Sequence, residues 1–284
     1  DVTAQDGTTT QTYTVTVTRE SPSSSGGGEP DEQDEPVTPD TPDAPSTGVN
    51  VLVNGKAEQT GTATTTVNGR SVTTVVIDSA KLKQRLDAAG EGAVITIPIP
   101  TASDVAIGEL DGQMVVAMED KQAVIEIRTD GATYTIPAEF IDIRAVSARF
   151  GQDVALSDIK IQIEIARPTA EETAIVQSSA TAGGFSLVLP PLKFSVRGEY
   201  DGQTVEISQF DAYVERMIAI PDDVDASRIT TAIVVDPDGT ARHVPTQIAK
   251  IDGRYYAKVN SLTNSLYSLV WNPVTFTDLE THWA

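Results

Sequence analysis

Five aspartates in the C-terminal third of this 284-residue sequence have the types and spacing that best suit a metal ion. They are Asp222, Asp223, Asp225, Asp236 and Asp238. Calcium prefers oxygen ligands, and an EF-hand loop places them at its first, third and fifth positions, ahead of a glycine. The segment DPDG matches the later positions, but Val234 stands at the first and no glutamate closes the loop. A turn between strands explains the same letters, so we expect no metal site and keep these aspartates as weak calcium candidates.

Catalytic chemistry is poorly represented among the other residues. The sequence has no cysteine and two histidines, His243 and His282. It therefore excludes a cysteine nucleophile, a zinc–thiolate site and a disulfide framework, and most hydrolase triads are hard to build. A glycosidase needs two carboxyl groups about 5–10 Å apart across a cleft, and no spacing here predicts such a pair. Phosphate loops, nucleophile elbows and zinc motifs are also missing from the sequence. We expect a protein that is not an enzyme and holds no cofactor.

The composition limits the class of protein and its partners. The chain carries 41 acidic and 20 basic residues, a formal net charge of −21, and 39% of its residues are hydrophobic. That hydrophobic fraction is enough for at least one substantial core, and a length of 284 residues fits one large or two smaller domains. Nucleic acids and anionic membrane surfaces would repel so acidic a chain, so we expect neither as a partner. No apolar run reaches the roughly 18–20 residues that span a bilayer.

The first 47 residues divide into two segments of different composition. Residues 13–18, YTVTVT, alternate like a half-buried strand and follow an Asp-Gly turn, so we expect residues 1–20 to be the final strands of a truncated β-sandwich. Residues 21–47 hold six prolines, seven acidic residues and no basic one. Such a segment cannot bury enough apolar surface to order itself, so we expect a disordered, extended acidic linker. The alternative for this segment is a tail that binds a basic partner.

Residues 48–272 are dense in short strands. The expected strands are 51–53, 71–77, 93–99, 123–128, 133–136, 159–166, 185–189, 193–197, 204–207, 229–235, 255–259 and 266–271. Asn-Gly and Asp-Gly pairs punctuate them, and these dipeptides supply the positive φ that tight hairpins need. The pattern predicts a mainly β fold, with antiparallel β-sandwich-like domains and a few short helices. We expect two linked subdomains that meet within residues 141–184.

Three segments have helical signals. In residues 78–89, Leu82 and Leu86 share a face, Asp78 or Ser79 can cap the start, and Gly90 follows the end. Residues 111–119 and 141–150 are weaker candidates for helices. We expect these helices to cover edges or ends of the sheets.

The last nine residues, FTDLETHWA, carry a specific pattern. Their matching positions are Phe276, Asp278, Leu279, His282, Trp283 and Ala284. This pattern resembles the opening of an S-layer homology (SLH) module, so residues 273–284 are expected to begin a truncated module of that family. Phe276 and Trp283 are interpreted as core residues of the module, and Asp278 as a brace at its start. The resemblance implies non-covalent attachment to secondary cell-wall polysaccharide in Gram-positive bacteria, through the complete SLH region of a parent protein and not through this chain alone.

Two further resemblances support a cell-surface origin. Residues 1–20 resemble the end of a cadherin-like β-sandwich repeat, in which an Asp-Gly turn precedes an alternating strand. Most of residues 48–272 resembles the region before the SLH modules of Paenibacillus-type surface proteins, with segments such as MIAIPDDVDASRITTAIV and SLTNSLYSLVW. Neither resemblance carries catalytic residues. Together they imply an extracellular location, at the cell wall or S-layer, and we expect the chain to be part of a longer protein.

The sequence supports two alternative functions. The first is a non-catalytic stalk segment of a secreted, SLH-anchored surface protein, which holds upstream domains away from the wall. The second is a carbohydrate-binding accessory module of an extracellular polysaccharide-degrading enzyme. The second function predicts a row of exposed aromatic side chains on one sheet face. Its members would come from Tyr200, Tyr213, Tyr255, Tyr256 and Tyr267.

Overall fold

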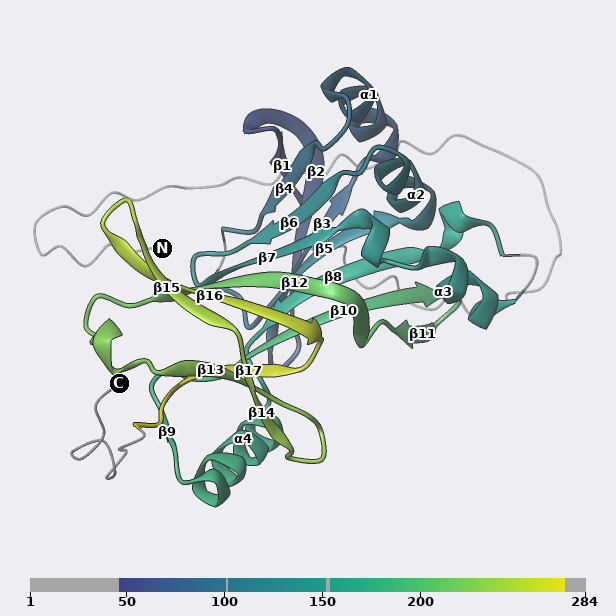
Figure 1. Ribbon diagram of the computed structural model, residues 1–284. Coiled ribbons are helices and arrows are strands. Elements are labelled where there is room, and N and C mark those ends of the chain that lie inside the picture. Colours follow the sequence, from purple (N-terminus) through teal and green to yellow (C-terminus); the bar gives the residue numbers. More distant parts are fainter. Residues whose placement is uncertain (1–45, 101, 152–153, 274–284) are drawn as a thin grey trace, which may run out of the picture. The chain divides into compact units, whose positions relative to one another are not determined.

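The computed structural model describes residues 46–100, 102–151 and 154–273 (Figure 1). The chain divides into two units, Asp1–Pro42 and Asp43–Ala284, and every described residue belongs to the second. The expected N-terminal strands, almost all of the expected linker and the expected SLH start lie outside the described residues. The first described strand begins at Ser46, two residues before the boundary expected for the body.

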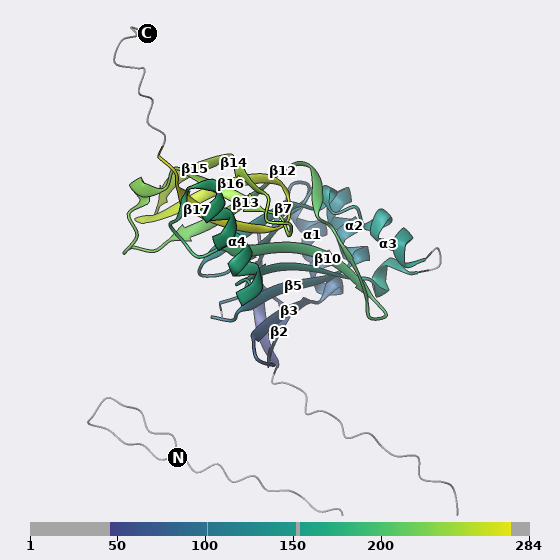
Figure 2. The same cartoon turned by 90° about the horizontal axis from the view of Figure 1, so that it is seen from below.

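Seven neighbouring strands form a first layer, part of which Figure 2 shows as β2, β3, β5 and β10. In spatial order the layer is β11 (Gln203–Glu206), β10 (Leu192–Tyr200), β8 (Lys160–Ala166), β5 (Val105–Asp111), β3 (Ser71–Ile77), β2 (Lys56–Val67) and β1 (Ser46–Val53). Side chains alternate between its two faces, so Ile161, Ile163 and Ile165 of β8 point to one side and the polar residues between them to the other.

The sheet continues through β1 into a second layer. Its further strands are β4 (Val94–Pro98), β6 (Val124–Arg128), β7 (Ala132–Pro137), β12 (Gln209–Ile220), β16 (Arg254–Thr263) and β15 (Thr246–Ile251). β1 joins the layers because it pairs with β2 along its whole length and with β4 through Leu52 and Val53.

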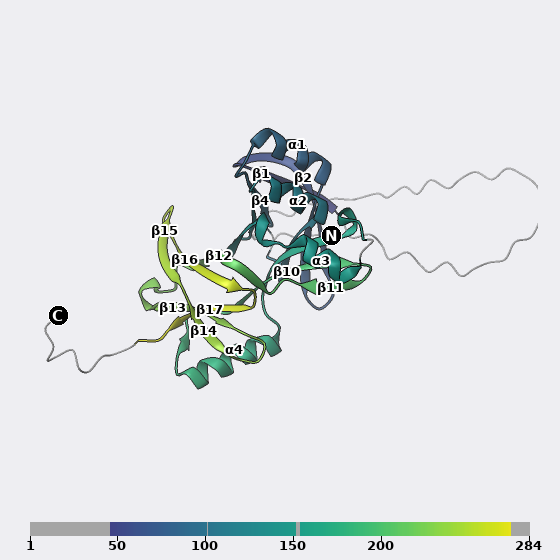
Figure 3. The same cartoon turned by 45° about the vertical axis from the view of Figure 1, so that its right-hand side comes forward.

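A smaller group of strands extends the sheet beside β10 (Figure 3). β17 (Leu266–Trp271) pairs with β10, with β13 (Thr231–Val235) and with β9 (Ser186–Leu187), while β13 also pairs with β14 (Ala241–Val244). The helix α4 (Ala170–Gly183) packs here, since Val176 is buried in one cluster with Ile233, Val235, Leu266 and Val270.

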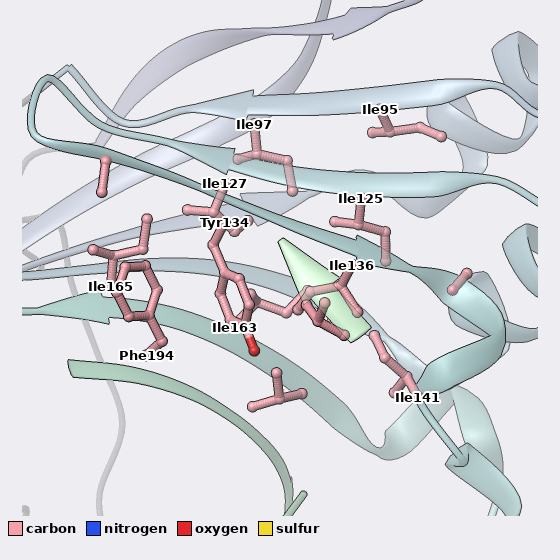
Figure 4. Close-up of a cluster of buried hydrophobic side chains, with 14 of the residues drawn as sticks. Ile95, Ile97, Ile125, Ile127, Tyr134, Ile136, Ile141, Ile163, Ile165 and Phe194 are labelled. Carbon is pink, nitrogen blue, oxygen red and sulfur yellow. The ribbon is translucent and has the colours of Figure 1, made fainter. Parts of the chain in front are cut away.

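The main core lies between the two layers and is rich in isoleucine. Figure 4 shows Ile95, Ile97, Ile125 and Ile127 of β4 and β6 on one side, facing side chains of β8 and β10. Because strand residues alternate, each layer offers a continuous apolar face to the other. The expected mainly β, sandwich-like fold with a few short helices is therefore confirmed for the described residues.

Two strand pairs are parallel, which the hairpin signals of the sequence do not indicate. β3 pairs with β5, and β4 pairs with β6, in parallel register. A parallel pair needs a crossover instead of a tight turn. The helix α1 (Ser79–Ala89) with β4 connects the first pair, and β5 with α2 (Gly112–Asp120) connects the second. Asn-Gly and Asp-Gly pairs indicate tight turns between strands that follow each other in the sequence, so they do not indicate these crossovers.

The three expected helices are present, each begun by an aspartate. Asp78, Asp111 and Asp142 accept hydrogen bonds from backbone N–H groups in the first turns of α1, α2 and α3 (Ile143–Phe150). The 3-10 helices are η1 (Ala138–Phe140), η2 (Leu156–Asp158) and η3 (Ala226–Arg228). Among the described residues, no helix has the length and apolar character needed to cross a membrane.

The helix α4 was not expected. Its sequence AEETAIVQSSATAG is rich in small residues and has no apolar stripe of helical period. Its one local signal is a capping box, in which Thr169 caps the backbone of Glu172 while the Glu172 side chain accepts from the Thr169 N–H. Gly184, in the left-handed conformation, ends the helix.

The pairing of β7 with β12 over Ala132–Thr135 joins segments on either side of residues 141–184, where the boundary between subdomains is expected. β8 lies within that range and pairs with β5 before it and with β10 after it. The main hydrophobic cluster likewise takes residues from Val51 to Leu269.

Candidate functional site

The best candidate site is the loop between β12 and β13, residues 221–228, which holds three of the five candidate aspartates. Pro221 directly follows β12, and its carbonyl accepts a hydrogen bond of 3.0 Å from the N–H of Val224. Asp225 caps η3 by accepting from the Ser227 N–H at 3.0 Å and the Ser227 hydroxyl at 2.6 Å. The hydroxyl bond, followed by the N–H bond, holds the pKa of the Asp225 carboxyl below its ordinary value. Asp225 therefore shapes the loop, while Asp222 and Asp223 stay exposed.

A groove of about 620 Å³ lies on one side of this loop. The loop contributes Asp222, Val224 and Asp225 to its lining, and β15 and β16 contribute Ile248 and Tyr255. The Tyr255 side chain is 42% exposed. Across the strand pair, the ammonium of Lys250 lies 4.9 Å from the centroid of the Tyr255 ring. The groove thus combines an accessible aromatic ring with carboxylates.

A second groove, of about 320 Å³, lies on the other side of the loop. Trp271 of β17 lines it together with Asp223 and Arg228. The Arg228 guanidinium carbon lies 5.9 Å from the centroid of the Trp271 ring. Val224 and Asp225 line both grooves, so the two hollows adjoin across the loop. Figure 3 shows β15 and β16 on one side of the loop and β13 and β17 on the other.

The structure does not bring the two groups of candidate aspartates together. Asp236 and Asp238 follow β13, whereas residues 221–228 precede it, so the strand separates them by roughly 17 Å. Arg242 donates to both Asp236 carboxylate oxygens at 2.9 Å, and Asp238 accepts from the Thr240 N–H. The N–H bond from Thr240 lowers the pKa of Asp238. Within the described ranges, no three acidic, cysteine or histidine residues are grouped so that they could hold a metal ion.

The five candidate tyrosines do not form a row. Tyr213 is 58% exposed, but Tyr267 is 1% exposed and Tyr200 packs on Phe150. The register opposes Ile220 to Tyr255 at one end of β12 and Val214 to Ser261 toward the other. Tyr213 and Tyr255 therefore lie roughly 20 Å apart along the strands. Of these tyrosines, Tyr255 lines the groove beside residues 221–228.

A charged network that sequence analysis missed lies on the outer face of β5, β8 and β10. Arg197 donates to Glu164 and to the Gln162 amide oxygen, each at 2.8 Å, and the Gln162 amide nitrogen donates to Glu109 and Glu199. Alternation along each strand puts these side chains on one face, but nothing local predicts which strands are adjacent. Since the groups satisfy one another, the network stabilises the sheet surface.

Arg216 is fully buried, and nothing in the local sequence indicates this. Its guanidinium donates to the carbonyls of Val214 and Thr263 at 3.0 and 2.8 Å and to the Asn264 side-chain oxygen at 2.9 Å. The rings of Tyr134, Phe194 and Tyr267 surround it. Burial raises the pKa of Tyr134 far above its ordinary value. Arg216 and the three rings are each at most 1% exposed, so this cluster belongs to the core.

The SLH-like residues Phe276, Asp278, His282 and Trp283 lie outside the described residues, so their expected roles stay predictions. No protein-family model matches the sequence, and the comparisons with curated proteins and with solved structures found no match. Fold and site together define a mainly β, sandwich-like domain with two adjoining grooves around one acidic loop.

Proposed function

We propose that this chain is a non-catalytic structural segment of a secreted, cell-wall-anchored surface protein, in which the folded body is a stalk that holds upstream domains away from the wall. The proposal is supported by the positions of the first and last strands, which lie on different sides of the folded body. In Figure 2 the start of β1 lies beside β2 and β3, whereas the end of β17 lies beside β15 on the other side of the body. Domains attached to the two ends are thereby separated by the body.

The first and last strands of the body, β1 and β17, are paired with neighbouring strands and buried in the core, as a stalk requires. β1 pairs with β2 along its whole length, and β17 pairs with β13 over Leu266–Val270 and with β10 and β9 besides. Val51 and Val53 of β1 and Tyr267 and Leu269 of β17 are buried in the same hydrophobic cluster. Tension between the ends would therefore act on one shared core.

The anchoring part of the proposal rests on the sequence. The segment FTDLETHWA follows the body directly and has the pattern that opens an SLH module. Residues 21–47, acidic and rich in proline, precede the body with the composition of a spacer. The partner proposed for the complete SLH region is secondary cell-wall polysaccharide, which places the parent protein at the cell wall or S-layer surface.

Cosedimentation with purified wall sacculi tests the anchoring part. A longer chain that continues from residue 284 through the complete SLH region is expected to pellet with the sacculi. The 284-residue chain is the matched control and is expected to stay in the supernatant. If the longer chain stayed in the supernatant while another SLH protein pelleted, the anchoring proposal would be wrong.

Single-molecule stretching of the 284-residue chain, held at its two ends, tests the stalk. Ser46 to Pro273 spans 228 residues (273 − 46 + 1). A body with one core is expected to unfold in a single step that releases roughly 70–80 nm of chain. Two well-separated steps would instead support the two subdomains expected from the sequence and contradict a single load-carrying core.

A further inference from the structure

We propose that the loop of residues 221–228 is a binding site for a neutral glycan, which contacts Tyr255 in one groove and Trp271 in the other. The proposal rests on the two grooves and the side chains that line them, and it is independent of the wall anchor. Every residue it uses lies in the described body.

The grooves together can hold an extended ligand. Their volumes, about 620 and 320 Å³, fall within the range of roughly 300–1,000 Å³ that is usual for ligand sites. Val224 and Asp225 line both hollows, so a chain that lies across the loop can occupy both at once. Hydrogen bonds within the loop fix its shape before any ligand arrives.

The two aromatic rings suit the faces of sugar rings. A pyranose has C–H groups on its faces and hydroxyls around its rim, so it can pack on a flat aromatic ring while its hydroxyls stay hydrogen-bonded. Tyr255 lines the first groove and is 42% exposed. Lys250 lies over that ring but is not among the residues that line the groove. Trp271 supplies the second ring.

The polar groups suit hydroxyls. The carboxylates of Asp222 and Asp223 are exposed, one in each groove, and can accept hydrogen bonds from sugar hydroxyls. Arg228 lines the second groove and can donate to hydroxyl or ring oxygens. Each groove thus offers an aromatic surface beside a hydrogen-bond acceptor.

Charge distinguishes a neutral glycan from charged ligands. Both aromatic rings already carry a basic side chain, Lys250 over Tyr255 and Arg228 over Trp271, so a basic peptide would meet like charge at both rings. An anionic polysaccharide would meet the loop aspartates and a chain with net charge −21. A neutral polyhydroxylated ligand avoids both repulsions.

Affinity electrophoresis of the 284-residue chain tests the site. Native gels would contain hydroxyethylcellulose, xylan, galactomannan or laminarin, and a parallel titration would use a lysine-rich peptide. Tyr255→Ala removes the exposed ring, and Asp222→Asn removes a surface charge with little change of shape. Tyr213→Ala is the matched control, because Tyr213 is more exposed than Tyr255 but lies roughly 20 Å from it along the strands. Circular dichroism checks that each variant keeps its fold.

The expected result is retardation by at least one of the four glycans, with affinity weakened at least about tenfold in Tyr255→Ala and Asp222→Asn and unchanged in Tyr213→Ala. Migration unaffected by all four glycans would overturn the proposal. So would an equal loss in Tyr213→Ala, or binding of the lysine-rich peptide in place of the glycans.

Discussion

The guanidinium carbon of Arg216 lies 4.5 Å from the centroid of the Tyr267 ring, inside the sandwich. Tyr267 in turn donates its hydroxyl to the carbonyl of Thr263, the same carbonyl that Arg216 bonds. Among the described residues, no carboxylate forms an ion pair with Arg216, and its Nε has no hydrogen-bond partner. Aromatic faces and neutral oxygens therefore compensate this buried cation, an arrangement that ties β12 to β7, β10 and β17.

Removing the Arg216 side chain should destabilise the body strongly. We expect Arg216→Ala to lower the free energy of unfolding by about 3–5 kcal/mol, because it leaves a cavity and removes the hydrogen bonds that Arg216 donates to Val214, Thr263 and Asn264. Arg216→Met fills most of the volume and should cost clearly less. Guanidinium denaturation of the full chain measures both. Arg254→Ala, an exposed arginine of β16, is the control, and equal effects of Arg216→Ala and Arg254→Ala would contradict the role of the buried cluster.

Gly198 of β10 is expected to tolerate no larger residue, because α3 packs directly on it. A Cβ at this position would lie 2.4 Å from a methyl group of Val146, whose branched side chain has little freedom to move. We expect Gly198→Ala to cost about 1–3 kcal/mol of unfolding free energy by overpacking. Gly131→Ala is the matched control, since a Cβ there meets no atom within 4 Å. Urea denaturation should show that adding Val146→Ala to Gly198→Ala restores part of the loss; no recovery would mean that another contact is responsible.

The capping box of α4 should matter more than is usual for a surface helix. Only Val176, Ser179 and Ala180 of α4 are buried, so packing contributes little to its stability. We expect Thr169→Ala to cost about 1 kcal/mol and to increase hydrogen exchange in the first turns of the helix. Thr181→Ala changes an exposed threonine near the other end and should leave that exchange unchanged. Equal exchange in the two variants would show that the cap does not hold the helix.

Stability should fall in acid, and Glu172 should contribute to the fall. Partial burial opposes ionisation of Glu172, but the hydrogen bonds from Lys193 and from the Thr169 N–H outweigh it and lower its pKa. A lowered pKa in the folded state means that the unfolded chain binds the proton more readily. The stabilisation is therefore present above the ordinary glutamate pKa of 4.5 and is lost as the pH falls through the lower pKa of the folded state. The hydrogen bonds that Asp104 accepts from Ser71 lower its pKa and act in the same direction.

Denaturant midpoints between about pH 3 and 6 measure this dependence. Glu172→Gln should flatten the profile, whereas Glu171→Gln, which lacks the bond to Lys193, should leave it unchanged. A profile that is flat in the unmodified chain would contradict the assignment.

Calcium should not stabilise the folded chain. Arg242 donates hydrogen bonds to Asp236, and backbone or side-chain groups donate to Asp225 and Asp238. These carboxylates therefore already have hydrogen-bond partners within the protein. We expect the melting temperature to be the same in roughly 1 mM calcium and in chelator, because stabilisation by a ligand requires binding to the folded state. A rise in calcium that Asp222→Asn abolished would show a metal site at the loop instead.

The local sequence was enough to predict most strands and three helices. β3 occupies the predicted residues 71–77 and β17 the predicted 266–271, because branched and aromatic residues favour strands. The start of α1 was equally visible, since Asp78 bonds a backbone N–H only three residues away. These signals act between near neighbours in the chain, so they can be read without knowing the fold.

Tertiary structure decided what the strands build. The parallel pairs β3–β5 and β4–β6, the buried position of Arg216 and the networks on the sheet surface depend on contacts between residues far apart in sequence. The candidate site shows the same division. The sequence identifies the aspartates of residues 221–228 and the tyrosines as candidates. Strand pairing and loop geometry decide that Tyr255 and Trp271 flank that loop while Tyr213 does not. The sequence determined the individual strands and helices and their local conformations. Which of them lie next to one another depends on the burial of one shared core, which no local segment specifies.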